Sequence, residues 1–290
     1  MQMYNKIENQ NFKSVLQADN VYVNNEVVSL ATLSQTPTRK GLEKAIISGG
    51  TIVNVVSNQY GHLPNEEFFL KVEEKLIDAE INYKTRSINR ENRSFAIDYI
   101  LEDANFEVEI KNGMDKIKPM LRFTNSYDGS CKTSGHFGFF REVCKNGLHV
   151  AHAEIGFSVK HLGDMAQLVL PEINHILKKF MDNEFYTLHR KFEVLAETQV
   201  HNISDFVKEV CGKTALFNFE SSEKNPEPSL NARLVIEAMQ KESNFLKSPP
   251  NLWLGYNAFN EVLHTKLKKT FDVQKRTDGK IFESILEMSN

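Results

Sequence analysis

The chain has 290 residues, of which 41% are apolar and 25% charged, and its formal net charge is −3. This composition is typical of a globular protein and excludes a collagen-like, mucin-like or mostly disordered chain. The near balance of charges also excludes a uniformly basic nucleic-acid coat, whereas a local basic patch remains compatible with it. At this length roughly 75% of the unfolded surface can be buried, so the core needs no disulfide or metal.

Membrane and secretory signals are not found in the sequence. No apolar run reaches the roughly 18 residues that a membrane span needs. Residues 1–5 contain no apolar segment of the kind that a signal peptide has. The three cysteines are too few for a disulfide scaffold and fit free thiols in a reducing compartment. We therefore expect a cytoplasmic protein that has no membrane partner.

The first half of the chain predicts a hairpin and then a helix. Gly49 and Gly50 separate two β-branched runs, 45–48 and 51–56. They predict a hairpin, because glycine takes a positive φ at both turn positions without steric cost. Pro64, followed closely by two glutamates, suits the first turn of a helix. Apolar residues at helical spacing extend this helix to residue 77.

A series of strands is expected after this helix. Apolar and polar residues alternate strictly over 95–101 and 106–110, which predicts half-buried strands. Four further strands are expected after the helix, over 81–85, 120–124, 135–143 and 148–159, and one short strand is expected before it, over 28–33. Short turns join most of these segments, so the pattern predicts an antiparallel meander.

The apolar period changes to 3.6 residues after residue 160. A stripe of apolar residues over 165–180 predicts a helix, with Pro171 as the expected position of a kink. Helical patterning continues to about residue 213. Two more helices are expected over 230–245 and 252–267.

These elements predict an α+β protein, in which an antiparallel β-sheet with packed helices is followed by a helical C-terminal half. The polar stretch 221–231 contains two prolines and is the best linker. We therefore expect an α+β core over 1–220, this linker, and a helical C-terminal region over 232–290.

Polar residues are densest in the middle of the chain. Two segments contribute, Ser-Tyr-Asp-Gly-Ser at 126–130 and Arg-Glu-Val-Cys-Lys-Asn at 141–146. An Asp-Gly pair is typical of a tight turn in which the aspartate caps backbone donors. The alternative is a small polar site for a phosphate or a metal, because backbone N–H groups in such a turn can bind anions. Its side chains would be Ser126, Asp128, Ser130 and Arg141.

The two segments resemble motifs of a phage- and plasmid-associated bacterial family, domain of unknown function 932. That family has a Ser-x-Asp-Gly-Ser turn and then an Arg-x-Val-Cys-x-Asn segment. The residues that match are Ser126, Asp128, Gly129, Ser130, Arg141, Val143, Cys144 and Asn146. The chain departs from the family at Tyr127, where histidine is usual, and at Gly147, where threonine is frequent.

Two flanking segments extend the resemblance to about residues 51–264. Residues 55–67 are similar to the strand and helix that open the family's domain, and residues 252–258 contain a similar Trp-x-x-x-Asn-Ala helix. The resemblance implies a protein of a phage or plasmid in the cytoplasm of a bacterial host. It implies no particular activity.

The order of helix, β-meander and helix is also similar to that of the phage single-strand annealing proteins of the Redβ, RecT and Erf type. Those proteins form oligomeric rings or filaments and hold single-stranded DNA on a basic groove. The similarity lies in the order of elements alone. It implies a protein that binds single-stranded DNA and promotes strand annealing as a homo-oligomer. The sequence contains no Gly-x-Ser-x-Gly elbow, Walker loop or His-Glu-x-x-His motif, so we expect a protein that is not an enzyme.

Clusters of basic residues fit this expectation. Four basic residues fall between Lys84 and Arg93 and are opposed only by Glu91. They could line a groove that follows phosphates, or they could form a solvated hairpin tip. The nucleic-acid-binding residues that we expect are Arg86, Arg90, Arg93 and Arg141, with Lys132 as a weaker candidate.

Other functions have weaker support. The aromatic run 136–140 partly resembles the base-stacking strand of an RNA-recognition motif, but core packing is the better interpretation. Cysteines and histidines between Cys131 and His152 lack the spacing of a structural zinc site. We therefore expect no metal and no cofactor. Two alternatives stay open, a protein-binding module such as an inhibitor of host defence or an assembly protein, and a metal-dependent hydrolase that uses Asp128.

Overall fold

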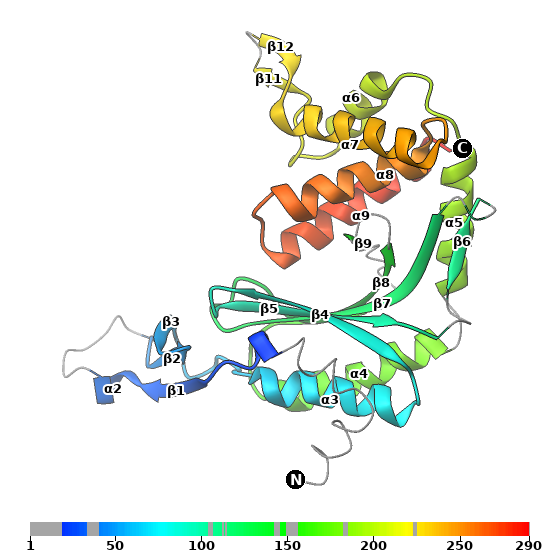
Figure 1. Ribbon diagram of the computed structural model, residues 1–290. Helices are drawn as coiled ribbons and strands as arrows, with labels where there is room; N and C mark the ends of the chain where they lie inside the picture. The colour runs from blue at the N-terminus through cyan, green and yellow to red at the C-terminus, as the bar shows by residue number, and fades with distance from the viewer. Residues whose placement is uncertain are drawn as a thin grey trace. The chain divides into compact units, whose positions relative to one another are not determined.

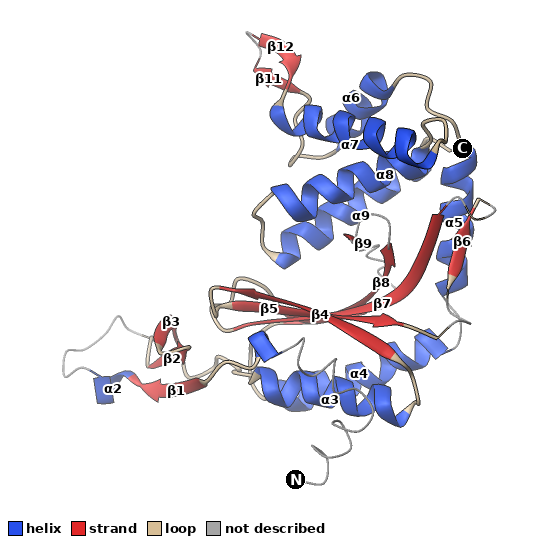
Figure 2. Ribbon diagram, viewed as in Figure 1, coloured by secondary structure: helices blue, strands red, loops and turns tan. Residues whose placement is uncertain are grey.

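The computed structural model describes residues 19–33, 41–103, 107–111, 113, 115–141, 146–148, 156–181, 185–222 and 225–289. Antiparallel strands dominate the first half of the chain and helices the second (Figure 1, Figure 2). The expected α+β class is therefore confirmed. The chain forms two compact units, which are described one at a time. The first comprises Met1–Phe106, Met120–Phe137 and Ala153–Met181, and the second comprises Glu107–Pro119, Gly138–His152 and Asp182–Asn290.

The first unit contains a small sheet, most of a larger sheet and two long helices. Its helical elements are η1 (Asp19–Val21), α2 (Leu30–Leu33), α3 (Asn65–Asp78) and α4 (Met165–Met181). Its strands are β1 (Asn25–Ser29), β2 (Lys44–Ser48), β3 (Thr51–Val56), β4 (Tyr83–Arg90), β5 (Ser94–Leu101) and β10 (Gly156–Val159). Parts of β7 (Asp115–Ser126) and β8 (Thr133–Arg141) complete it.

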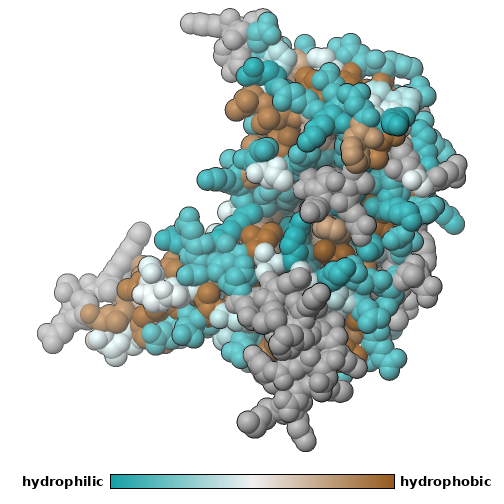
Figure 3. Space-filling model, in the orientation of Figure 1, coloured by the Kyte–Doolittle hydropathy of each residue, from teal (hydrophilic) through white to brown (hydrophobic). Residues whose placement is uncertain are grey.

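The small sheet has the order β1–β2–β3, and its second turn is the expected Gly-Gly hairpin. Gly49 and Gly50 have φ values of 57° and 77°, which explains why glycine occupies both positions. Apolar side chains remain exposed on this sheet, with exposed fractions of 40% for Val27 and 51% for Ile52. Figure 3 shows apolar residues over this part of the surface.

The larger sheet of the first unit is antiparallel, with the order β10–β8–β7–β5–β4. Side chains alternate along each strand, so the odd-numbered residues of β4, β5 and β7 share one face. Phe95, Ile97 and Tyr99 on this face are fully buried, and the Tyr99 hydroxyl donates to the Phe69 carbonyl of α3 at 3.4 Å. Helices α3 and α4 contact each other on this side of the sheet (Figure 1). The even-numbered face points away from them.

The second unit is mainly helical. Its helices are α5 (Phe185–Glu197), α6 (Ile203–Lys213), α7 (Leu230–Leu246), α8 (Leu252–Glu261), the π-helical turn η3 (Val262–Lys266) and α9 (Phe271–Glu287). Its strands are β6 (Val108–Ile110), β9 (Asn146–Leu148), β11 (Glu220–Ser222) and β12 (Asn225–Pro228), with the remaining parts of β7 and β8. Aromatic rings form its core, since Phe192 of α5 packs against both Trp253 and Phe282.

The two units divide the chain differently from the boundaries that the sequence suggested. Helices α5 and α6 contact the C-terminal helices, and Phe206 of α6 packs edge-on against Phe259 of α8. Residues 221–231, expected as a linker, contain most of the β11–β12 hairpin and the first residues of α7. Pro228 is compatible with such a strand, because proline is tolerated at sheet edges.

Other elements also differ from the expected ranges. The strand expected over 28–33 ends at Ser29, and one helical turn, α2, follows it. Within 148–159 the described strand is β10, and β9 ends at Leu148. The helix expected over 252–267 changes to π geometry at Val262, which an apolar period of 3.6 residues does not reveal. None of the described helices is long and apolar enough to cross a membrane.

Candidate functional site

Three charged residues form a row on the even-numbered face of the larger sheet. The strand register places Arg86 opposite Asp98, and Asp98 opposite Arg122. Arg86 donates to Asp98 Oδ2 from Nε at 2.9 Å and from Nη2 at 2.6 Å. Arg122 donates to the same carboxylate from Nη2 at 2.6 Å and from Nε. One buried carboxylate therefore fixes two guanidinium groups.

The ionisation of Asp98 follows from these contacts. The carboxylate is fully buried, and burial alone would raise its pKa. The charges and hydrogen bonds of Arg122 and Arg86 outweigh burial and hold the pKa of Asp98 below its usual value. Asp98 therefore stays ionised, and the side chain of Arg86 remains 34% exposed beside it.

Arg90 extends this basic face toward the end of the sheet. The register aligns Arg90 with Ser94, and Ser94 with Ser126. Burial and then the charge of Arg122 lower the pKa of Arg90, whereas Cys131 raises it. Arg86, Arg90 and Arg122 therefore share the even-numbered face of the sheet, and two of them contact Asp98.

The Ser-Tyr-Asp-Gly-Ser segment forms a tight turn directly after β7. Asp128 Oδ1 accepts a hydrogen bond from the Ser130 backbone N–H at 2.9 Å. Ser126 Oγ donates to the Cys131 carbonyl at 2.6 Å and accepts from the Cys131 N–H at 3.3 Å. Gly129 has a φ of 72°, which favours glycine at this position. The serine and aspartate side chains therefore stabilise the turn.

Two side chains that the sequence did not single out hold this turn in place. His161 Nε2 lies 3.2 Å from the Cys131 carbonyl oxygen and 3.4 Å from Ser126 Oγ. The ring of Tyr60 stacks on that of His161, with 5.2 Å between centroids. The Tyr60 hydroxyl donates to the backbone carbonyls of Ser126 and Tyr127. No local pattern near Tyr60 or His161 indicates this role, because the turn that they hold is distant in sequence.

Arg93 and Lys132 lie at the same end of the sheet. Arg93 is exposed in the β4–β5 turn, and its carbonyl accepts from the Tyr127 N–H at 2.7 Å. Lys132 is half-buried next to β8, and its carbonyl accepts from Thr124 Oγ1. The first unit thus holds four of the five expected basic residues, with Arg86 in the middle of β4 and the other three at the end of the sheet where the polar turn lies. We call this set the basic sheet end, and it consists of Arg86, Arg90, Arg93, Lys132 and the turn at 126–130.

The second unit holds the remaining expected residues in another environment. Arg141 is fully buried, donates from Nε to Asp115 and donates from Nη1 to Glu242. A buried guanidinium that two carboxylates engage is not available to a phosphate, so we exclude Arg141 from the interface. Asn146 lies opposite Arg141 in the β8–β9 pairing. Val143 and Cys144 fall outside the described residues.

The aromatic run 136–140 contributes to the core. Phe137 and Phe139 have exposed fractions of 1% and 0%, so they do not offer rings for base stacking. Among the described residues, no group of three or more histidine, cysteine or acidic side chains could hold a metal. His149 and His152 lie outside the described residues.

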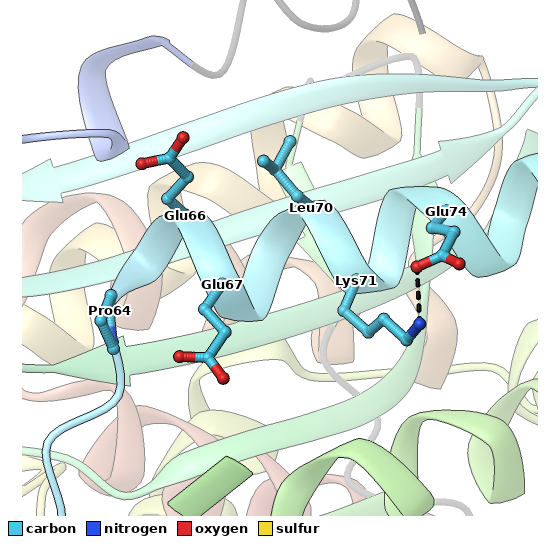
Figure 4. Close-up of a pocket in the computed structure, with 6 residues that line it drawn as sticks. All are labelled: Pro64, Glu66, Glu67, Leu70, Lys71 and Glu74. Atoms are coloured by element: carbon cyan, nitrogen blue, oxygen red, sulfur yellow. Dashed lines mark hydrogen bonds and ion pairs between the residues drawn. The ribbon is translucent and has the colours of Figure 1, made fainter. Parts of the chain in front are cut away.

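A pocket lies on the outer surface of α3 (Figure 4). Acidic side chains dominate its lining, and one of them, Glu74, accepts from Lys71 Nζ at 2.6 Å. The lining residues are Pro64, Glu66, Glu67, Leu70, Lys71 and Glu74. Its excess of carboxylates disfavours an anionic ligand.

Comparisons with known proteins gave one match. A family model described as "Domain of unknown function (DUF932)" matches residues 52–280, which is well over half of the chain. The comparison with curated proteins and the comparison with solved structures found no match.

Proposed function

The chain belongs to the DUF932 family, and on this premise we propose that it binds single-stranded nucleic acid at the basic sheet end of its first unit. One observation carries the proposal. Three basic residues of β4 and the turn after it, and Lys132 beside β8, lie on the part of the sheet whose opposite face packs against α3. Nucleic-acid backbones are bound mainly through such groups.

The arrangement suits an extended anion better than a small one. Basic side chains extend from β4, through the β4–β5 turn, to the residue that precedes β8. Arg86 is already oriented by Asp98, so contact with a phosphate would cost it little conformational entropy. Guanidinium groups also bind phosphate oxygens in a bidentate manner. A chain of phosphates could therefore contact several of these groups at once.

Strand annealing by an oligomer, in a phage or plasmid setting, is the finer form of this proposal. It rests on the similarity between the element order expected from the sequence and that of single-strand annealing proteins. Its test is the rate at which the purified chain anneals two complementary oligonucleotides, compared with the rate without protein. An unchanged rate would leave only the binding function.

The binding function is tested by fluorescence anisotropy of a labelled single-stranded oligonucleotide over a series of salt concentrations, with duplex DNA in parallel. The test variant is Arg93→Ala/Lys132→Ala, which does not touch the Asp98 ion pairs. Each lost phosphate contact should reduce the slope of log K against log salt by about 0.7, so about 1.4 for this variant.

The matched control is Lys75→Ala/Lys178→Ala, which removes the same charge from α3 and α4. We expect its affinity and salt slope to equal those of the unmodified chain. Absence of binding at low salt would overturn the proposal, as would equal losses in both variants. A protein-binding role would then become the leading interpretation.

A further inference from the structure

A short segment before β1 lies against α3 and the larger sheet of the first unit. Residues 20–24 comprise the end of η1 and the loop before β1, and we call them the N-terminal strap. Val21 is fully buried, and its carbonyl accepts from Asn65 Nδ2 of α3 at 2.7 Å. The carbonyl of Asn20 accepts from Asn89 Nδ2 of β4 at 2.6 Å. Neutral hydrogen bonds and one buried apolar side chain therefore attach the strap.

The strap also contacts a buried acid. Tyr22 donates to Glu73 Oε1 of α3 at 3.4 Å, and Glu73 is fully buried. Tyr99 of β5 lies 3.4 Å from the same oxygen. The Tyr99 hydroxyl has one proton for two acceptors, since the Phe69 carbonyl also lies 3.4 Å away. Neither phenol is a cation, so an ionised Glu73 would be a buried charge without compensation.

The elements packed around Glu73 supply no buried cation among their described residues. The odd-numbered face of β4 and β5 and the strap itself contain no charged residue. The other charged side chains of α3 and of α4, which contacts α3, are exposed or half-buried. They are Glu66, Glu67, Lys71, Glu74, Lys75, Asp78, Glu172, His175, Lys178 and Lys179. Burial accordingly raises the pKa of Glu73 to about 7, although Tyr99 and Tyr22 lower it in part.

We propose that the N-terminal strap is a pH-sensitive device, which is closed over Glu73 while the carboxyl is protonated and opens when the carboxyl ionises. An ionised Glu73 gains water only if a group that buries it moves. Tyr99 is fixed within the sheet, whereas Tyr22 belongs to a short segment outside it. Local opening of such a segment costs less free energy than global unfolding. The inference does not depend on nucleic-acid binding.

The test is amide hydrogen exchange of the full chain at pH 6 and pH 8, with rates corrected for the intrinsic pH dependence of exchange. The reporter is the Gly49 N–H, which donates to the Asn24 carbonyl of the strap at 2.9 Å. The pKa of Glu73 is about 7 in the closed strap, and we expect about 4.5 in the open one. Linkage then raises the opening constant about tenfold over this interval, and the protection of Gly49 should fall by the same factor.

Two variants complete the test. Glu73→Gln keeps the size of the side chain without its charge and should not show this rise. Glu74→Gln, at the next position of α3 and half-buried, is the matched control and should keep it. His62 contacts Asn25, the residue after the strap, and its titration acts in the opposite direction. The ratio of the opening constants of the unmodified chain and Glu73→Gln cancels that contribution.

The unmodified chain decides even if Glu73→Gln does not fold, because an opening constant that does not increase from pH 6 to pH 8 would overturn the proposal. A rise that persists in Glu73→Gln would overturn the role of Glu73. Urea below the unfolding transition identifies the moving part, since opening of a short segment exposes little surface and depends weakly on urea. Exchange of Gly49 that depends on urea as steeply as global unfolding would overturn strap opening.

Discussion

The indole nitrogen of Trp253 donates a hydrogen bond to Asp115 Oδ2 at 2.9 Å, although 138 positions separate the two residues. The same carboxylate accepts from Arg141 Nε, and Arg141 in turn donates to Glu242. Arg141 and Trp253 belong to two separate segments that resemble the family. Their shared partner shows that both serve one buried network in the second unit.

Asp115→Asn should lower the free energy of unfolding by about 3 kcal/mol. The amide leaves the buried guanidinium of Arg141 with less compensation, and breaking a buried ion pair from one side is costly. Urea unfolding followed by Trp253 fluorescence measures the loss. The control Glu209→Gln removes an exposed carboxylate from α6 and should change stability by less than about 0.5 kcal/mol. Equal effects of the two variants would contradict a structural role for the network.

Glu73 should make the chain less stable as the pH rises from about 4.5 to 7. Burial raises the pKa of Glu73 from 4.5 to about 7, although hydrogen bonds from Tyr99 and Tyr22 lower it. In this interval the unfolded chain loses the proton and the folded chain keeps it, so stability falls as pH increases. A shift of this size corresponds to about 3 kcal/mol at and above pH 7.

Glu73→Gln should remove this part of the pH dependence and be the more stable form above pH 7. Urea midpoints at several pH values measure the difference between the variant and the unmodified chain. Glu74→Gln, one position along α3 and only half-buried, is the matched control and should keep the original slope. If the urea midpoints of Glu73→Gln and of the unmodified chain changed with pH in the same way, Glu73 would not be the source of this pH dependence.

His62 should produce the opposite slope in acid. Burial, and then the neighbouring His161, lower the pKa of His62 from 6.5 to about 4, and its Nε2 lies 2.7 Å from Asn25 Oδ1. The unfolded chain binds a proton at His62 below pH 6.5 while the folded chain resists it, so stability falls as pH decreases toward 4. The effect is less than about 3 kcal/mol, because solvent screens a half-buried ring.

His62→Gln should flatten the acid limb of the stability profile. The measurement is the difference in free energy of unfolding between the variant and the unmodified chain, taken at pH 6.5 and at pH 4.5. The contribution of Glu73 is the same in both chains and cancels in this difference. His175→Gln, an exposed histidine on α4, is the control and should leave the profile unchanged. A variant as acid-sensitive as the unmodified chain would show that another group is responsible.

Local signals predicted the elements but not their partners. The Gly49–Gly50 pair predicted its hairpin, because the backbone requirement lies within the two residues. The even spacing of Arg86 and Arg90 indicates a shared face of β4. Their environment depends on Asp98 and Arg122, which the register of three strands brings opposite them. This register cannot be predicted from the sequence of any single strand, because it depends on how three strands pair.

Burial of charge was the least predictable property of the candidate site. Arg141 resembled a binding residue because its own segment is polar, whereas its carboxylate partners lie 26 and 101 positions away. Tyr60 and His161 were missed for the same reason, because they hold the turn after β7 from distant segments. Sequence patterns therefore identified the residue types of the site more readily than their accessibility.

Gly135→Ala should destabilise the chain, whereas Gly212→Ala should not. A Cβ at Gly135 would lie 2.5 Å from Phe157 Cε1 and 2.6 Å from Phe123 Cε1, inside the packed sheet of the first unit. Such overpacking costs about 1–3 kcal/mol, because neither ring can move freely. A Cβ at Gly212 in α6 would meet no atom within 4 Å. Alanine there should stabilise the helix by about 0.5 kcal/mol. Urea unfolding of both variants measures the pair, and a neutral Gly135→Ala would show that the rings on this sheet face repack.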